Sequence, residues 1–205
     1  MSGHTPELSP LPASIARVLV TGFMGAGKTT VGRMLAERLG WDFADSDHLL
    51  EARTGGSIAA IFETHGEPAF RDLEAATIRA TVARDHLVLA LGGGALERPE
   101  TRSLLASLPD SLLIFLDAPL DVLVSRCSVQ PDAPVRPVLS DRARLQERWT
   151  TRLPWYRQAR LTVNTEGCTP DQVAQRILAL IGDRCGSAAQ GSASFPARPR
   201  TGVHV

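Results

Sequence analysis

The sequence predicts an α/β fold, in which helices cover both faces of one parallel β-sheet. Short apolar or β-branched segments alternate along the chain with segments of helical periodicity, as in successive βαβ units. The apolar segments lack alternating polar residues, which is typical of strands buried on both faces. A glycine-rich segment, residues 22–29, follows the first expected strand and precedes the first expected helix, as a phosphate-binding loop does.

The N-terminal half of the chain begins this alternation. Arg17–Thr21 is a β-branched run and predicts a strand, and Lys28–Leu39 predicts a helix with one apolar face and Gly40 as its stop. A short strand is expected over Trp41–Ala44, ending at Asp45. The next expected elements are the helices Ser57–His65 and Glu67–Arg84 and the apolar strand Leu87–Leu91.

The C-terminal half continues the pattern. Its expected elements are the helix Glu97–Leu108, the strand Leu112–Leu116, the helices Leu120–Ser125 and Asp141–Arg160, and the strand Leu161–Asn164. Three prolines predict a loop over Val129–Leu139. Thr169 and Gln172 form the pattern of a capping box, with Pro170 at the first position of a last helix.

Length and composition restrict the possible classes of function. The chain has 205 residues, of which 43% are hydrophobic, enough for one domain with a sizeable core. Its 22 basic and 22 acidic residues cancel, which argues against non-specific binding to nucleic acids or membrane surfaces. Three cysteines without C-x-x-C spacing indicate a reducing compartment rather than a disulfide framework. We expect a monomer with small-molecule substrates and neither nucleic-acid nor membrane partners.

Both ends of the chain have the composition of flexible segments. Residues 1–14 are rich in proline and lack the apolar core of a signal peptide, so we expect a cytoplasmic location. Residues 185–205 are rich in Gly, Ser, Ala and Pro. We therefore expect a single domain over residues 15–184, with a disordered lead and a disordered tail.

The segment Gly22–Thr29 fits the phosphate-loop pattern G-x-x-x-x-G-K-[ST]. Lys28 is the single lysine among the 22 basic residues, and it can reach the β- and γ-phosphates of a nucleotide. Thr29 can offer its hydroxyl to Mg²⁺. The alternative is a glycine-rich turn without a ligand. The expected ATP contacts in this region are Gly25, Ala26, Gly27, Lys28, Thr29 and Thr30.

Candidate acceptor-binding residues follow the next two strands. Asp45 and Asp47 come at the end of the second strand, where one can face a metal and the other an acceptor hydroxyl. Either aspartate could instead cap a helix. The triplet Gly92–Gly94 permits close approach of the backbone to a ligand, although a flexible turn is the alternative.

Three arginines are candidates for anion binding. Arg71 precedes Glu74 by three residues, so a carboxylate can orient its guanidinium, although an ordinary surface ion pair is the alternative. Arg157 has the same ambiguity. Arg136 lies among prolines, which suits a lid that closes over the transferred phosphate, or else a solvated loop.

Taken in order, these segments resemble those of the shikimate kinase family. The matching segments are GFMGAGKTT (Gly22–Thr30), DSD (Asp45–Asp47), TGGSIAAIF (Thr54–Phe62), GEPAFRDLE (Gly66–Glu74), LALGGGAL (Leu89–Leu96), VRPVL (Val135–Leu139) and RLPWYRQAR (Arg152–Arg160). The resemblance implies a P-loop, nucleoside-monophosphate-kinase-like α/β/α fold with a five-stranded parallel sheet and a mobile lid at about residues 126–139. It also implies transfer of the γ-phosphate of ATP to the 3-hydroxyl of shikimate.

The resemblance implies a role for each matching residue. Shikimate would be bound by Asp47, Arg71, Gly92, Gly93, Gly94 and Arg157. ATP would also contact Arg126, Arg136 and Pro170, and Mg²⁺ would lie near Thr29 and Asp45. The catalytic groups would be Lys28, Asp47 and Arg136. Two other readings stay open, a gluconokinase-like sugar-acid kinase and an inactive binding module with the same fold.

Overall fold

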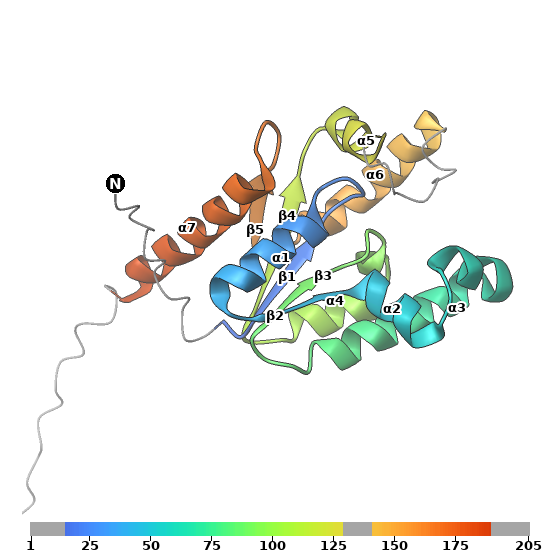
Figure 1. The fold of residues 1–205 in the computed structure, drawn as a ribbon, viewed down its shortest axis with the longest axis horizontal. Coiled ribbons are helices and arrows are strands. Elements are labelled where there is room, and N and C mark those ends of the chain that lie inside the picture. The colour runs from blue at the N-terminus through green and yellow to red at the C-terminus, as the bar shows by residue number, and fades with distance from the viewer. Residues whose placement is uncertain (1–14, 129–140, 190–205) are drawn as a thin grey trace, which may run out of the picture.

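The computed structural model of the protein describes residues 15–128 and 141–189. The expectations for residues 1–14, for the loop over Val129–Leu139 with Arg136, and for residues 190–205 lie outside the described residues. Within the described part, the fold is the expected three-layer α/β/α arrangement around a parallel sheet (Figure 1). No described helix has both the length and the apolar character that crossing a membrane requires.

The sheet has five parallel strands in the order β2-β3-β1-β4-β5. Their bounds are β1 Arg17–Thr21, β2 Asp42–Asp45, β3 Leu87–Ala90, β4 Ser111–Asp117 and β5 Leu161–Asn164. Strands β1 and β3 are fully buried over Val18–Val20 and Leu87–Ala90, because neighbouring strands and helices cover them on all sides. The prediction of a doubly covered parallel sheet is therefore confirmed.

Helices lie on both sides of this sheet (Figure 1). Helix α1 (Lys28–Leu39) packs against α7 (Pro170–Ala189) on one side, and α3 (Ile58–Thr81) packs against α4 (Pro99–Ala106) on the other. The remaining helical elements are α2 Ser46–Thr54, the 3₁₀ turn η1 Ala95–Glu97, α5 Leu120–Ser128 and α6 Arg142–Tyr156. Helix α7 continues to Ala189, past the expected start of the tail at residue 185.

The ends of α1 and α7 follow the expected rules. Gly40 ends α1 in a left-handed conformation, with φ of 64°, that a residue without a Cβ adopts readily. Thr169 Oγ1 accepts from the backbone N–H of Gln172 at 3.3 Å, and Gln172 Oε1 accepts from the N–H of Thr169 at 2.9 Å. The predicted capping box is therefore confirmed.

Helix α2 was not among the expected helices. It begins directly after Asp45, whose side chain accepts from the backbone N–H groups of Asp47 and His48. The residues that follow are mostly polar, and their few apolar residues do not recur at helical spacing, so only the cap indicates the helix. The two expected helices between Ser57 and Arg84 form one element, α3, with a break at Gly66, where φ is 77° and ψ is 170°.

Replacing Thr169 with Ala should lower the free energy of unfolding by about 1 kcal/mol, because one backbone N–H at the start of α7 loses its acceptor. Urea denaturation measures this loss. Thr151→Ala is a matched control: its hydroxyl is exposed within α6 and bonds a carbonyl oxygen of its own helix, so its removal should cost little. Equal losses in both variants would show that the cap contributes nothing specific.

Candidate active site

A cleft of about 670 Å³ lies at the carboxyl ends of the strands. In an open parallel sheet this edge is where ligands bind, next to the strand at which the chain order reverses. Here that strand is β1, since the chain passes from β1 to β2 on one side and later to β4 on the other. The predicted site residues that line the cleft are Gly25, Ala26, Gly27, Lys28, Thr29, Thr30, Asp45, Asp47, Gly93, Gly94, Arg126 and Pro170.

The loop after β1 requires glycine for two separate reasons. Gly22, Gly25 and Gly27 all have φ between 76° and 148°, in the region that L side chains rarely adopt. A Cβ on Gly22 would also lie 2.7 Å from the carbonyl oxygen of Leu116, and one on Gly25 would lie 2.2 Å from that of Leu123. The loop therefore curls against β4 and α5 with its backbone alone. Gly27 is the N-cap of α1, so the positive end of that helix opens into the loop.

Lys28 and Thr29 begin helix α1 at the floor of the cleft. Lys28 Nζ donates to the carbonyl oxygen of Phe23 at 3.0 Å, which folds its ammonium back over the loop. Thr29 Oγ1 donates to Asp45 Oδ2 at 2.7 Å. Asp45 Oδ1 accepts from the backbone N–H of Asp47 at 3.0 Å, so one carboxylate both caps α2 and contacts Thr29. The reading of Asp45 as a helix cap is therefore confirmed, and its second carboxylate oxygen stays directed at Thr29 in the cleft.

The donors at this point fit Mg²⁺. Thr29 and Asp45 offer a hydroxyl and a carboxylate oxygen, and hard oxygen donors are the ligands that Mg²⁺ prefers. Among the described residues no group of three or more His, Cys, Asp or Glu side chains gathers in a metal-binding cluster. Mg²⁺ commonly takes only one or two protein ligands and completes its shell with water and phosphate oxygens, so this pair suffices.

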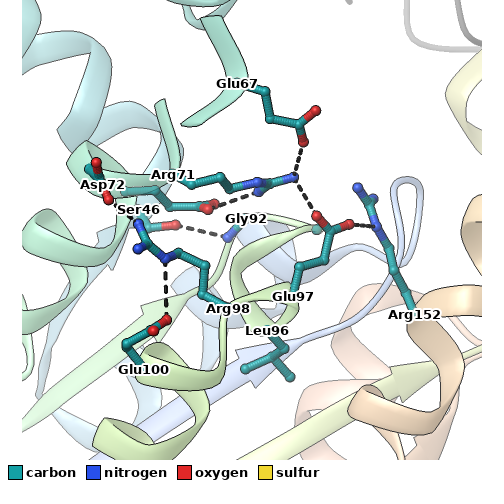
Figure 2. Close-up of polar contacts among 12 residues, drawn as sticks. Ser46, Glu67, Arg71, Asp72, Gly92, Leu96, Glu97, Arg98, Glu100 and Arg152 are labelled. Carbon is teal, nitrogen blue, oxygen red and sulfur yellow. Dashed lines mark hydrogen bonds and ion pairs between the residues drawn. The ribbon is translucent and has the colours of Figure 1, made fainter. Parts of the chain in front are cut away.

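The glycine triplet brings β3 against the acceptor side of the cleft. A Cβ on Gly92 would lie 2.4 Å from Asp47 Oδ1 and 2.8 Å from Glu74 Oε1, so these carboxylates pack directly on the backbone. The N–H of Gly92 donates to Ser46 Oγ at 2.8 Å (Figure 2). The hydroxyl of Tyr156, which is buried, donates to the carbonyl oxygen of Gly93. The triplet is thus held on two sides by hydrogen bonds.

Arg71 is held by three glutamates (Figure 2). Its Nη1 donates to Glu74 Oε2 at 2.9 Å, and its Nη2 donates to Glu97 Oε2 at 2.8 Å and to Glu67 Oε1 at 3.2 Å. Burial lowers the pKa of the Arg71 guanidinium, but the neighbouring carboxylates, Glu74 first, outweigh it, so the pKa is raised. Burial raises the pKa of the Glu74 carboxyl, and the Arg71 charge opposes that shift. Arg71 is therefore a fixed cation rather than a solvated surface residue.

The structure places Arg152, and not Arg157, beside Arg71. Arg152 is buried, lines the cleft, and donates through Nε to Glu97 Oε1 at 2.6 Å. Arg157 is exposed at the C-cap of α6, is not among the residues that line the cleft, and lies near Asp117. Five residues along an α-helix turn the side chain by about 140°, so the two arginines cannot share a face. The expectation for Arg157 is corrected accordingly.

Glu97 is a further site residue that the sequence did not indicate. Helical periodicity placed this residue at the start of a long helix, whereas it ends the 3₁₀ turn η1 and bridges two arginines. The signal that could have found Arg152 is its spacing from Tyr156. Residues four apart share a helix face, and the structure buries both of these side chains.

The far end of the cleft is formed by α5 and the start of α7. Arg126 donates to Thr165 through Nη1 to Oγ1 at 2.9 Å and through Nη2 to the carbonyl oxygen at 2.6 Å. Pro170 and Cys168 line the same end. A fixed guanidinium and a proline ring are suited to cover the faces of a nucleotide base, in keeping with the predicted contacts of Arg126 and Pro170.

Comparison with known proteins gives matches in both sequence and structure. The sequence profile of the family described as shikimate kinase matches residues 24–182. The shikimate kinase of a Synechococcus species is 41% identical over 184 residues, which cover 88% of this chain and 89% of that protein. The shikimate kinase of Acinetobacter baumannii, solved in complex with shikimate, is 37% identical with a TM-score of 0.77, over 83% of this chain and 94% of that one.

A more distant structural similarity bears on the alternative that the chain is a gluconokinase-like sugar-acid kinase. The crystal structure of a gluconokinase from Sinorhizobium meliloti has a TM-score of 0.61 at 20% identity, over 90% of this chain and 99% of that one. Identity at this level shows a shared fold alone.

Replacing Tyr156 with Phe should lower the free energy of unfolding by about 1–2 kcal/mol, because the carbonyl of Gly93 loses the hydrogen bond from the buried Tyr156 hydroxyl. The ring itself stays and keeps its stacking on Phe115, whose centroid lies 5.2 Å away. Urea denaturation of the two proteins measures the difference. An unchanged unfolding midpoint would mean that this hydrogen bond does not hold the glycine triplet.

Proposed function

The chain belongs to the shikimate kinase family, and from that premise we propose how its own residues transfer the γ-phosphate of ATP to the 3-hydroxyl of shikimate. The products are shikimate 3-phosphate and ADP. The reaction is a step in aromatic amino acid biosynthesis. The observation that carries the assignment is the juxtaposition of a phosphate-binding loop with Asp47 and the Arg71–Arg152 pair at one edge of the sheet. ATP dependence supports the expected cytoplasmic location.

The nucleotide half of the site is the loop with α1 and the far end of the cleft. The curled backbone of residues 22–27 and the N-terminus of α1 offer N–H groups to the β- and γ-phosphates. We assign Lys28 to the bridging region between these phosphates. The bond between Lys28 and the Phe23 carbonyl would be exchanged for phosphate oxygens. Arg126 and Pro170 would flank the base.

Thr29 and Asp45 would hold Mg²⁺, which supplies a counter-charge for the phosphate oxygens when it is bound. The hydrogen bond from Thr29 to Asp45 keeps both donors aimed at one point before the ion arrives. Arg136, which lies outside the described residues, remains a predicted contact to the transferred phosphate.

In the acceptor half of the site, arginines and an aspartate would bind different parts of one small acid. Arg71 and Arg152 would bind the carboxylate of shikimate, since paired guanidinium groups match a carboxylate in shape and charge. Asp47 would accept a hydrogen bond from the ring hydroxyl that is phosphorylated, and could take its proton as the bond to phosphorus forms. Gly93 and Gly94 line the cleft between them and let the ring approach the backbone. Phosphoryl transfer then depends mainly on positioning and charge neutralisation.

The sugar-acid kinase reading fits the site less well. A gluconate chain also offers a carboxylate and hydroxyls, but the likeness to a gluconokinase is one of fold alone. The inactive binding-module reading would be expected to lack a lysine, an aspartate or an acceptor arginine. Here Lys28, Asp47 and Arg152 all line one cleft, and Arg71, which does not line it, is joined to Arg152 through Glu97.

A coupled assay of ADP release separates these readings. It compares shikimate, gluconate and no acceptor, each with ATP and Mg²⁺. Release that depends on shikimate supports the proposal. Release that depends on gluconate, or none with either acid, would overturn it.

Lys28→Ala should lower kcat at least about 100-fold, because the variant loses the charge that faces the developing negative charge in the transition state. Circular dichroism and the melting temperature establish that the variant is folded. A folded variant that keeps more than about a tenth of the wild-type kcat would contradict the role of Lys28.

Arg152→Lys should raise the KM for shikimate about tenfold or more while leaving the KM for ATP nearly unchanged. The substitution keeps the charge but loses the planar fork, and hydrogen bonds between charged groups contribute about 1.5–3 kcal/mol. Arg157→Lys, at the C-cap of the same helix, is the matched control and should leave both constants nearly unchanged. The reverse result would restore the sequence-based assignment of Arg157.

A further inference from the structure

A carboxylate of the chain itself lies on the arginine pair. Glu97 Oε2 accepts from Arg71 Nη2 at 2.8 Å, and Glu97 Oε1 accepts from Arg152 Nε at 2.6 Å. Figure 2 shows this carboxylate between the two guanidinium groups, with one oxygen directed to each. We propose that Glu97 holds the place of the acceptor's carboxylate, and that shikimate must displace it to bind. This inference rests on the proposed function, since it concerns the acceptor of that reaction.

The local charge balance requires a displacement. Two cations, Arg71 and Arg152, are surrounded by Glu67, Glu74 and Glu97. A substrate carboxylate would be a fourth anion around two guanidinium groups that are only 13% and 10% exposed. Like charges in such a poorly solvated place repel strongly, so one internal carboxylate has to leave.

Burial and geometry single out Glu97 among the three. The side chain of Glu74 is 4% exposed and packs on Gly92, so it has no room to move. Glu67 is 61% exposed and contacts Arg71 at 3.2 Å, but within the described part of the chain it makes no ion pair with Arg152. Glu97 is 26% exposed and is the glutamate with an oxygen on each arginine. Its contacts are those that a bound acid would need.

A cavity beside Glu97 can accommodate its displaced carboxylate. This cavity, of about 230 Å³, is lined by Glu97 and Arg152 together with Arg144, Glu147 and Arg148 of α6. A turn of the Glu97 side chain into this cavity would bring its carboxylate toward Arg144 and Arg148. With Arg144 and Arg148 against the single carboxylate of Glu147, the charge that α6 brings to this cavity is positive and can receive that of Glu97, so the exchange needs no change of protonation.

Glu97 would therefore determine acceptor specificity. When a competent conformation is only partly populated, the apparent dissociation constant rises in inverse proportion to that population. A small acid that has only a carboxylate would form with the arginines no more contacts than the protein loses when Glu97 is displaced. Shikimate, with hydroxyls that Asp47 can bind, has further contacts and can complete the displacement.

The test is the steady-state kinetics of Glu97→Gln, which removes the charge and keeps the size of the side chain. We expect the KM for shikimate to fall about three- to tenfold, while kcat and the KM for ATP stay within about twofold. Glu67→Gln is the matched control, because it removes the same charge from Arg71 without freeing both arginines. It should change the KM for shikimate by about twofold or less. An unchanged or raised KM in Glu97→Gln would overturn the inference.

A binding measurement avoids any dependence on turnover. Saturating shikimate should raise the melting temperature of Glu97→Gln more than that of the wild type, because the variant binds it more tightly. An equal or smaller rise would count against displacement. Should Glu97→Gln fail to fold, Glu97→Asp replaces it: its shorter side chain keeps the charge but cannot reach both arginines, so the KM should again fall. A wild-type protein that does not phosphorylate shikimate would overturn the proposed function instead.

Discussion

The parallel pairing of β1 with both β3 and β4 is the constraint on which the site depends. Asp45 at the end of β2 pairs with Ala90 of β3, and Thr21 of β1 pairs with Phe115 of β4. Because parallel strands all end at the same edge, the loop, the aspartates and the glycine triplet emerge together there. A slip of one residue in any pairing would exchange the two faces of that strand, so its side chains would meet the wrong layer of helices, and would shift its loop relative to the neighbouring loops.

Each of the cations at this edge of the sheet is held by an oxygen atom of the protein. Lys28 donates to a loop carbonyl, Arg126 donates to Thr165, and Arg71 and Arg152 share the carboxylate of Glu97. These partners orient long side chains that would otherwise lose rotamer entropy on binding a ligand. Binding in such a site exchanges internal contacts for contacts to the ligand.

The sequence was informative where local rules govern the structure. The five strands, the loop at Gly22–Thr29 and the capping box at Thr169 all follow from residue type and spacing within one segment. Helix α2 escaped prediction because its residues carry little apolar periodicity. The choice between Arg152 and Arg157 depends on which face of α6 meets the sheet edge, and the bonds of Glu97 join residues 26 and 55 positions away. Such contacts are properties of the tertiary fold.

The internal partners also bear on how tightly the site can bind. A buried guanidinium left without a counter-charge destabilises a protein by about 3–5 kcal/mol, so the folded chain needs a carboxylate beside Arg152 when no acid is bound, whereas Arg71 keeps Glu74. Glu97 supplies it, and the affinity for an acid becomes the difference between two similar carboxylate contacts. That difference is small for the carboxylate alone, which leaves the hydroxyl contacts of the ring to decide which acid binds. A site that needs an internal anion for stability thereby gains selectivity against simple acids, at the expense of affinity for every acid.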